Sequence, residues 1–280
     1  MTAISPEVTL ANSHPHTPGS LAAVRTLAAR RFALTARTPR ELLVPLITPL
    51  LFAMVIAPAL KNALHTGVGY ESLVAVGTIG LLIPLNTMFS GLSVIVDRES
   101  GARRELLAAP VARPMIVVGN LLVALATTGL QIGALLLFAH LRRIHFDITA
   151  GRFVWLAAAA TLFTIGMYGV AEVLASRVPR AEEYISRLPA IAIVPWFLAG
   201  SLFPITALPV VLEWIARFLP LTHALALMRY GLLGDPQGLE NIWRGSDPTT
   251  MALLSLLIVA SFATTLTVAS IRVFTREALR

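Results

Sequence analysis

The sequence predicts an all-α integral membrane protein with six transmembrane helices. Of its 280 residues, 56% are hydrophobic and 13% are charged, and the mean hydropathy is +0.77. Soluble domains carry about 25% charged residues, so this composition argues against an ordinary soluble fold. The apolar residues gather in runs close to the ~20 residues that a bilayer requires. The net charge of +7 comes from arginines scattered between these runs, which is typical of membrane topology rather than of a nucleic-acid surface.

The chain divides into a short tail and one membrane domain. Residues 1–18 are rich in Thr, Ser, Pro and His and contain no apolar stretch of signal-peptide length, which predicts a disordered cytoplasmic tail. His14 and His16 lie in this tail without a third ligand nearby, so no metal site is predicted. Residues 19–280 form the predicted transmembrane domain.

A helix over residues 19–38 is predicted to begin this domain. Its apolar side is formed by Leu21, Val24, Ala28 and Phe32. Arg25 and Arg31 border this side, and their long stems can lie along apolar surface while the guanidinium groups reach lipid phosphates. We therefore expect an interfacial helix parallel to the membrane, with an ordinary solvated helix as the alternative.

Six apolar runs follow, and each is predicted to span the membrane. They cover residues 42–60, 73–96, 115–139, 153–175, 188 to about 208, and 251–273. The fifth run is interrupted by several prolines, Pro189 and Pro195 among them. Proline leaves backbone groups that neighbouring helices must satisfy, so we expect this span to pack inside the bundle or to line a cavity. The first run, with Pro45, Pro49 and Pro58, raises the same expectation.

The placement of basic residues predicts the orientation. If the N-terminus is cytoplasmic, fifteen of the 22 basic residues fall in inner segments and seven in outer ones. The positive-inside rule therefore predicts that both termini and the loop after the second span are cytoplasmic. The excess of arginine over the single lysine, Lys61, together with abundant alanine, indicates a GC-rich bacterial source, so we expect a bacterial plasma membrane.

Residues 209–245, between the fifth and sixth spans, are too polar for another span and too apolar for a free loop. The first part has helical spacing of its apolar residues, and Glu213 and Arg217 can pair at i and i+4. Pro220 separates it from a second helical piece over residues 223–233. We expect an extracellular helical hairpin that caps the bundle or dips into the outer leaflet.

Motifs of common enzymes are missing. A Walker A loop requires Gly-Lys, but Leu60 precedes the only lysine, Lys61. There is no His-Glu-x-x-His zinc motif, and Met88 stands where an intramembrane serine protease with Ser90 would favour glycine. We therefore predict no catalytic residues, no enzymatic activity and no cofactor bound by this chain.

Polar side chains inside the predicted spans are the candidate pathway residues. They are Asn86, Thr87, Thr127, Thr128, Gln131 and Glu172. Such residues more often join helices than bind a substrate, and both interpretations stay open. Glu172 lies near the cytoplasmic end of its span, where Arg177 or Arg180 could neutralise it; a proton relay is the functional alternative. Gly129 and Gly133 would let another helix approach the third span closely.

Residues 97–114, after the second span, concentrate four arginines and three acids. This insert contains Asp97-Arg98-Glu99-Ser100-Gly101, then Glu105-Leu106-Leu107 and Pro110. The outer segment contains Phe203-Pro204-Ile205, Leu208-Pro209, Pro220-Leu221-Thr222 and Arg229. With the six spans and the interfacial helix, these two patches resemble the permease subunits of type-2 ATP-binding-cassette (ABC-2) exporters of the daunorubicin-resistance type. Asp97 stands where a glutamate is usual, and Leu219 where an asparagine often precedes the proline.

The resemblance implies a cytoplasmic coupling helix that contacts a separate ATPase subunit. Its candidate residues are Asp97, Arg98, Glu99, Gly101, Arg103, Arg104, Glu105, Leu106 and Leu107. A helix here would set Glu99 against Arg103 and offer Leu106 and Leu107 as apolar contacts. The positive-inside rule explains the arginines of this insert but not its acids, because acids contribute little to topology.

The resemblance also implies the partners and the activity. The permease would pair with a second permease chain, the same or a related one, and with ATPase subunits that carry the ATP and Mg. It would export a small lipophilic compound, either a drug or antibiotic or a lipid-like molecule. A proton-driven secondary transporter that uses Glu172, or a membrane adaptor that does not transport, are the alternatives.

Overall fold

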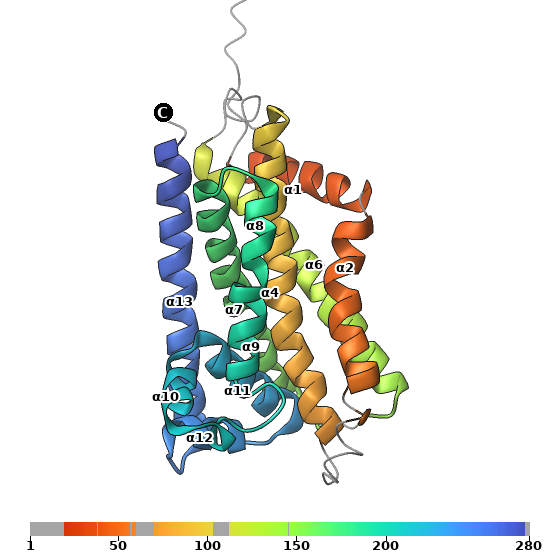
Figure 1. The fold of residues 1–280 in the computed structure, drawn as a ribbon, viewed down its shortest axis with the longest axis vertical. Helices are drawn as coiled ribbons and strands as arrows, with labels where there is room; N and C mark the ends of the chain where they lie inside the picture. Colours follow the sequence, from red (N-terminus) through yellow and green to blue (C-terminus); the bar gives the residue numbers. More distant parts are fainter. Residues whose placement is uncertain are drawn as a thin grey trace, which may run out of the picture.

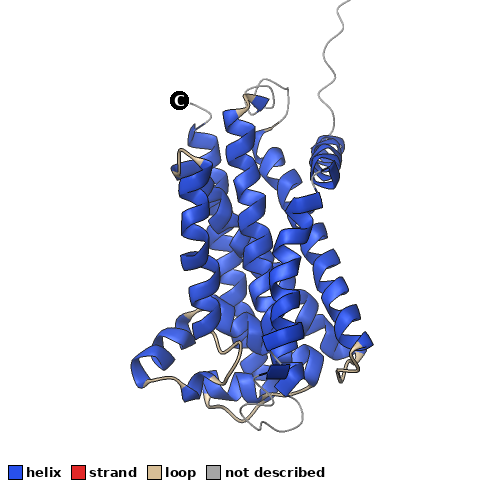
Figure 2. Cartoon of the chain, turned by 45° about the vertical axis from the view of Figure 1, so that its right-hand side comes forward, coloured by secondary structure: helices blue, strands red, loops and turns tan. Residues whose placement is uncertain are grey.

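The computed structural model describes residues 20–37, 39–56, 58–59, 70–102, 112–144 and 146–277, and these form a bundle of helices (Figure 1). Over these residues the chain contains helices and loops and no strand (Figure 2). The all-α prediction is therefore confirmed for the part of the chain that the structure describes. The predicted tail, residues 1–18, lies outside it.

Four helices are long and apolar enough to cross a bilayer: α4 (Tyr70–Glu99), α6 (Arg113–Leu141), α7 (Ala150–Arg177) and α13 (Pro248–Glu277). Each contains one of the predicted spans and extends it by two to four residues at either end. The extensions are polar or mixed in composition, so hydropathy predicts the apolar middle of each helix and not its full length. At 1.5 Å per residue these helices are about 45 Å long, enough to pass through the headgroup layers as well.

The first and fifth predicted spans are helical but interrupted. The helix α2 (Pro39–Leu51) continues into a π-helical turn over Phe52–Ile56. In the fifth, α8 (Ala181–Leu188), a π-helical turn over Pro189–Ile193 and α9 (Val194–Leu198) follow one another. The predicted bounds of 188–208 are therefore wrong, because this helical run starts earlier and ends before Gly200, whose φ of +80° is typical of a helix end. Six membrane spans stay a prediction.

The outer segment has the predicted pair of short helices, α10 (Val210–Phe218) and α11 (Pro220–Leu233). Their axes are bent by 78°, and if they count as one broken span the described helices offer up to five spans. The second helix begins at Pro220 rather than at residue 223, because proline is favoured in the first turn, where no N–H is needed. A short 3₁₀ turn (Ile205–Ala207) precedes the pair, and α12 (Gln237–Trp243), which was not predicted, follows it.

The helices α4 and α7 form the centre of the bundle. The apolar part of α4 is 78% buried, compared with 28% for α13, which lies along the outside of α7. Gly169 of α7 permits this close packing, because a Cβ there would lie 2.7 Å from the backbone carbon of Leu266. Small residues thus set the α7–α13 contact.

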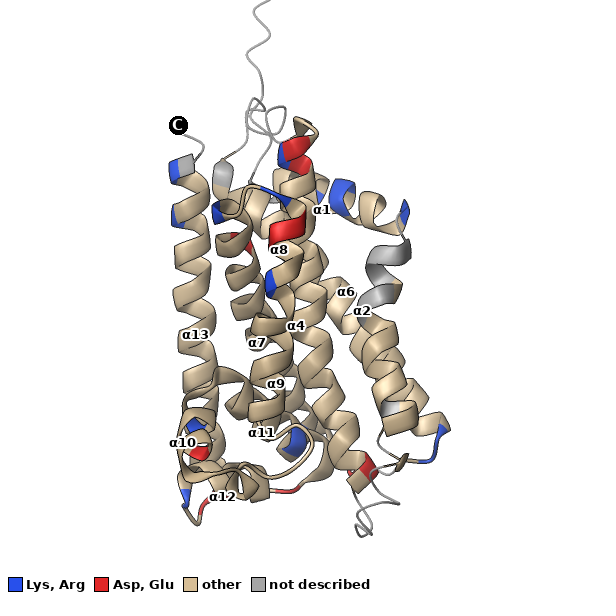
Figure 3. Cartoon of the chain, in the orientation of Figure 1, with Lys and Arg blue, Asp and Glu red and all other residues tan. Residues whose placement is uncertain are grey.

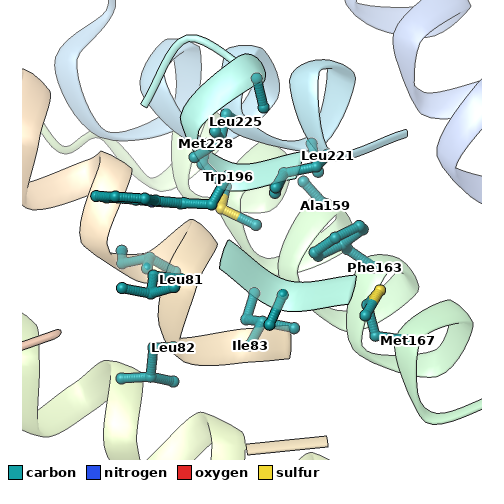
Figure 4. Close-up of a cluster of buried hydrophobic side chains, with 14 of the residues drawn as sticks. Leu81, Leu82, Ile83, Ala159, Phe163, Met167, Trp196, Leu221, Leu225 and Met228 are labelled. Carbon is teal, nitrogen blue, oxygen red and sulfur yellow. The ribbon is translucent and has the colours of Figure 1, made fainter. Parts of the chain in front are cut away.

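Trp196 joins the interrupted fifth segment to the core. Its indole is 1% exposed, and its Nε1 donates a hydrogen bond of 2.7 Å to the carbonyl oxygen of Gly77 on α4. Figure 4 shows Trp196 beside aliphatic side chains of α4 and α11, with Phe163 and Met167 of α7 nearby. One side of α9 therefore packs on the core through Trp196, while Val194 and Phe197 are exposed, so the prediction that the fifth segment lies inside the bundle holds for this side only.

The charged residues lie mainly at the two ends of the bundle. Figure 3 shows most Lys, Arg, Asp and Glu residues near the end that carries α1 (Ser20–Arg37) and the C-terminus, or near the end that carries α10 and α12. The long middles of α6 and α13 are almost free of charge. This distribution suits helices whose middles lie in hydrocarbon.

Candidate functional site

The C-terminal end of α4 is tied to α1 by an ion pair. Arg31 Nη1 lies 3.3 Å from Asp97 Oδ2, and the two side chains are 9% and 19% exposed. The expectation that the guanidinium group of Arg31 reaches lipid phosphates is therefore wrong, because it is turned into the bundle. Asp97, in contrast, was predicted as a residue of the ATPase contact, and the structure gives it a partner inside the chain.

The side of α1 that packs on the bundle differs from the predicted apolar side. Phe32 is 52% exposed, whereas Ala23 and Arg31 are buried and Leu27 packs beside them. These three residues are four apart, so they follow one stripe of the helix. Gly119 of α6 makes room for this stripe, because a Cβ there would lie 3.0 Å from Leu27 Cβ. The hydrophobic pattern of the sequence did not predict this face, because the charged residue Arg31 lies in it.

The next residue of α4, Arg98, binds the end of α7. Its guanidinium group donates hydrogen bonds to the carbonyl oxygens of Ala175, Val178 and Pro179, at 3.1, 2.6 and 3.1 Å. The last carbonyls of a helix have no partners within the helix, and a cation is favoured there. Local sequence gives no signal for this contact, because its acceptors lie 77 to 81 residues away.

The described chain stops shortly after these two anchors. Glu99 is exposed, and Gly101 has a φ of +81°. Arg103, Arg104, Glu105, Leu106 and Leu107 lie outside the described residues, so the coupling helix and its Glu99–Arg103 pair remain predictions. The start of the insert is thus attached to α1 through Asp97 and to the end of α7 through Arg98.

A small hollow lies between α1, α4 and α6, and its free space is about that of one water molecule. Its polar lining comes from Arg31, Thr35, Asn86, Ser90 and Thr127, and its apolar lining from Phe89, Val123 and Ala124. The hollow therefore reaches from the Arg31–Asp97 pair toward the middle of α4. Ligand pockets for drug-sized molecules are far larger, so in this structure the hollow is a small polar recess between helices and not a formed substrate site.

Three of the predicted pathway residues meet beside this hollow. Asn86 Nδ2 lies 3.2 Å from Thr127 Oγ1, 2.5 Å from Thr128 Oγ1 and 3.4 Å from the carbonyl oxygen of Ala124. Asn86, Thr127 and Thr128 are all at most 5% exposed. This cluster joins α4 to α6 within the bundle, which is the helix-joining role typical of such residues. Because Asn86 and Thr127 also line the hollow, the cluster forms part of its wall.

The other predicted pathway residues lie apart from this wall. The hydroxyl of Thr87 donates to the carbonyl oxygens of Ile83 and Pro84 in its own helix. Gln131 is buried one turn beyond Thr127. Glu172 is 4% exposed and accepts a hydrogen bond from the Tyr168 hydroxyl, while Arg177 and Arg180, the expected partners, are exposed. Glu172 is not among the residues that line the hollow.

The side chains at the hollow are polar or apolar groups that can contact a molecule without reacting with it. The described residues include no group of three His, Asp or Glu side chains that could hold a metal ion. The lining of the hollow between α1, α4 and α6 provides a cation, hydroxyl groups and apolar side chains. Fold and site together define a multi-pass helical membrane protein with a small hollow near the end of the bundle that carries α1 and the C-terminus.

Comparison with known proteins gives the family. The model of the ABC-2 type transporter family matches residues 22–233, so the chain belongs to this family of transport permeases. The match begins in α1 and ends with α11, and it therefore contains the hollow, the charged insert and the outer helix pair.

Three of the proteins with similar sequences illustrate the family. Nodulation protein J of Rhizobium leguminosarum bv. viciae is 30% identical over 183 residues, 61% of this chain and 65% of the relative. The putative transport permease ycf38 of Porphyra purpurea is 24% identical over 212 residues, 74% and 72% of the two chains. The linearmycin resistance permease protein LnrN of Bacillus subtilis is 27% identical over 152 residues, 54% of this chain and 39% of the relative. The alignments thus cover less than two thirds of the first and third relatives.

Proposed function

We propose that this chain is the permease subunit of an ATP-driven exporter, which moves a lipophilic compound out of the cytoplasm while a separate ABC ATPase supplies the energy. The observation that carries the proposal is the family match over residues 22–233, which includes the interfacial helix, the hollow and the charged insert. The chain itself has no Walker A loop, so energy from ATP must come from a partner.

The contacts at the inner end of α4 support a coupling role for the charged insert. Asp97 is paired with α1, and Arg98 is bound to the end of α7. A partner that pushes on residues 99–111 would therefore act on α1, α4 and α7 together. We assign the ATPase contact to Glu99, Gly101, Arg103, Arg104, Glu105, Leu106 and Leu107, with Asp97 and Arg98 as its anchors.

The substrate class rests on the family and on one relative, because the hollow between α1, α4 and α6 is too small in this structure to hold a drug-sized molecule. The Bacillus relative is named as a resistance permease, which favours a drug or antibiotic; a lipid-like molecule is the alternative. A second permease chain, the same or a related one, completes the assembly in a bacterial plasma membrane with both termini in the cytoplasm.

The test is to express the chain with the ATPase encoded beside it and to measure ATP hydrolysis in vesicles with daunorubicin as the probe. The variant Glu99→Lys/Glu105→Lys is expected to insert normally, to lose the co-purifying ATPase and to show only basal hydrolysis. Glu240→Lys, an exposed acid on α12, is the matched control and is expected to behave as the wild type. Full transport by the double variant, or an ATPase that never co-purifies with the wild type, would contradict the proposal.

A further inference from the structure

A second hollow, with free space for about one water molecule, lies at the end of the bundle that carries α10 and α12. It is bounded by the loop after α9, by α11 and by α12. Thr222 and Arg229 of α11 and Asn241 of α12 contribute its polar lining. The hollow is separate from the one between α1, α4 and α6, and the transport proposal makes no use of it.

Two buried polar atoms in this lining have no hydrogen-bond partner: Arg229 Nε and Thr222 Oγ1. The two residues are 7% and 3% exposed. Buried polar atoms are almost always satisfied, since an unsatisfied one costs free energy when it leaves water. Two such atoms on one small hollow indicate that a ligand with hydrogen-bond accepting capacity fills it.

The charge of Arg229 identifies the ligand more closely. Its Nη2 donates to the carbonyl oxygens of Gly200 and Ser201, at 2.5 and 3.3 Å, and so caps the end of α9. Within the described part of the chain, no carboxylate lies within 4.0 Å of this guanidinium group, and Asp235 acts on it only from farther away. Buried charges are normally paired with an opposite charge, and neutral carbonyls do not supply one.

A buried water molecule would satisfy the two polar atoms but would leave the charge of Arg229 uncompensated. A small anion does both, because it accepts hydrogen bonds and carries the missing charge. The space beside these atoms has the size of a single water molecule or halide ion rather than of a phosphate or a carboxylic acid.

We propose that this hollow binds one small anion, chloride under physiological conditions, between Arg229 and Thr222. The bound ion neutralises Arg229 and holds α11 against the end of α9. The outer end of the bundle is then more stable in chloride than in salts whose anion is too large for the hollow. The proposal does not depend on the transported compound or on the ATPase.

The test measures the melting temperature of the purified full-length chain in detergent, with sodium chloride, sodium bromide or sodium gluconate at constant ionic strength. Chloride and bromide are expected to raise the melting temperature in a saturable way, and gluconate is not. Thr222→Val removes the hydroxyl at nearly constant volume and is expected to weaken the apparent halide affinity about tenfold, the effect of one charge-assisted hydrogen bond.

Two controls make the result specific. Thr222→Ser keeps a hydroxyl and is expected to keep the halide response, and Thr264→Val, at an exposed position of α13, is expected to leave it unchanged. Arg229→Gln also deletes the cap of α9, so the Thr222 pair carries the test. Equal melting temperatures in chloride and gluconate, which would mean water only, overturn the proposal. A full halide response in Thr222→Val overturns it as well.

Discussion

At the scale of single residues, the pair Arg31–Asp97 joins positions 66 residues apart. Both side chains are largely withdrawn from solvent. Losing one partner of such a pair costs more than losing a surface ion pair, because a charge is left behind in a poorly solvated place. The pair thus joins α1 to the end of α4 beside the hollow.

We predict that Arg31→Gln and Asp97→Asn each lower the free energy of unfolding by about 1–3 kcal/mol, between the values for exposed and fully buried pairs. The exchange Arg31→Asp/Asp97→Arg is expected to recover most of the loss. Chemical denaturation in detergent measures all three. Arg187→Gln, in the exposed pair with Glu183, is the control and should cost less than about 0.5 kcal/mol. An exchanged pair as unstable as the sum of the single variants would show that the two side chains do not interact.

At the scale of elements, the contact between α7 and α13 depends on backbone approach. Gly169 faces the backbone of Leu266, and a Cβ on Gly166 would lie 2.4 Å from ring carbons of Phe262. Gly151, in the first turn of the same helix, has nothing within 4 Å of its position for a Cβ. The helix α7 therefore contains a tightly packed glycine, Gly169, and an unpacked one, Gly151, that can serve as its control.

We predict that Gly169→Ala destabilises the protein by roughly 1–3 kcal/mol, because the backbone of Leu266 cannot move aside as a side chain can. Gly151→Ala makes the same chemical change without a contact, and its gain in helix propensity should leave stability equal or slightly higher. Thermal unfolding of the two variants in the same detergent gives the comparison. Equal stability of Gly169→Ala and Gly151→Ala would mean that α7 and α13 are not packed as described.

The same scale shows what sequence alone could and could not predict. The four long spans were predicted within a few residues, since a long apolar run is a local signal. The predicted bounds of the fifth segment were wrong because α-helical and π-helical turns follow one another there. Hydropathy does not distinguish these types of turn. Asn86 and Thr127 were chosen as polar residues, but their contact depends on the register of α4 against α6. The contacts of Arg31 and Arg98 depend on residues far away in the chain.

At the scale of the whole molecule, the source of energy separates the exporter from a proton-driven transporter. Glu172 is buried, accepts a hydrogen bond from Tyr168 and does not line the hollow between α1, α4 and α6. A proton relay needs a path from the acid to water, and a side chain that is 4% exposed has little contact with water. These contacts favour a structural role for Glu172.

We predict that Glu172→Gln, whose amide oxygen can still accept from Tyr168, keeps at least half of the transport rate in inside-out vesicles supplied with ATP. A protonophore should leave that rate unchanged, and omission of ATP should abolish it. The measurement is uptake of a fluorescent lipophilic compound by vesicles that contain the chain and its ATPase. Loss of transport both in Glu172→Gln and on addition of the protonophore would favour the proton-driven alternative instead.

The helix α4 is fastened near both of its ends. Arg98 holds its C-terminal end to the carbonyls at the end of α7, and the carbonyl of Gly77 holds its N-terminal part to Trp196. These two points lie about 30 Å apart along the helix axis. Pro84 stands between them and removes one hydrogen bond of the helix, so bending is easiest there. The two halves of α4 can therefore tilt against one another at Pro84 while each keeps its own contact, with α7 through Arg98 and with Trp196 through Gly77.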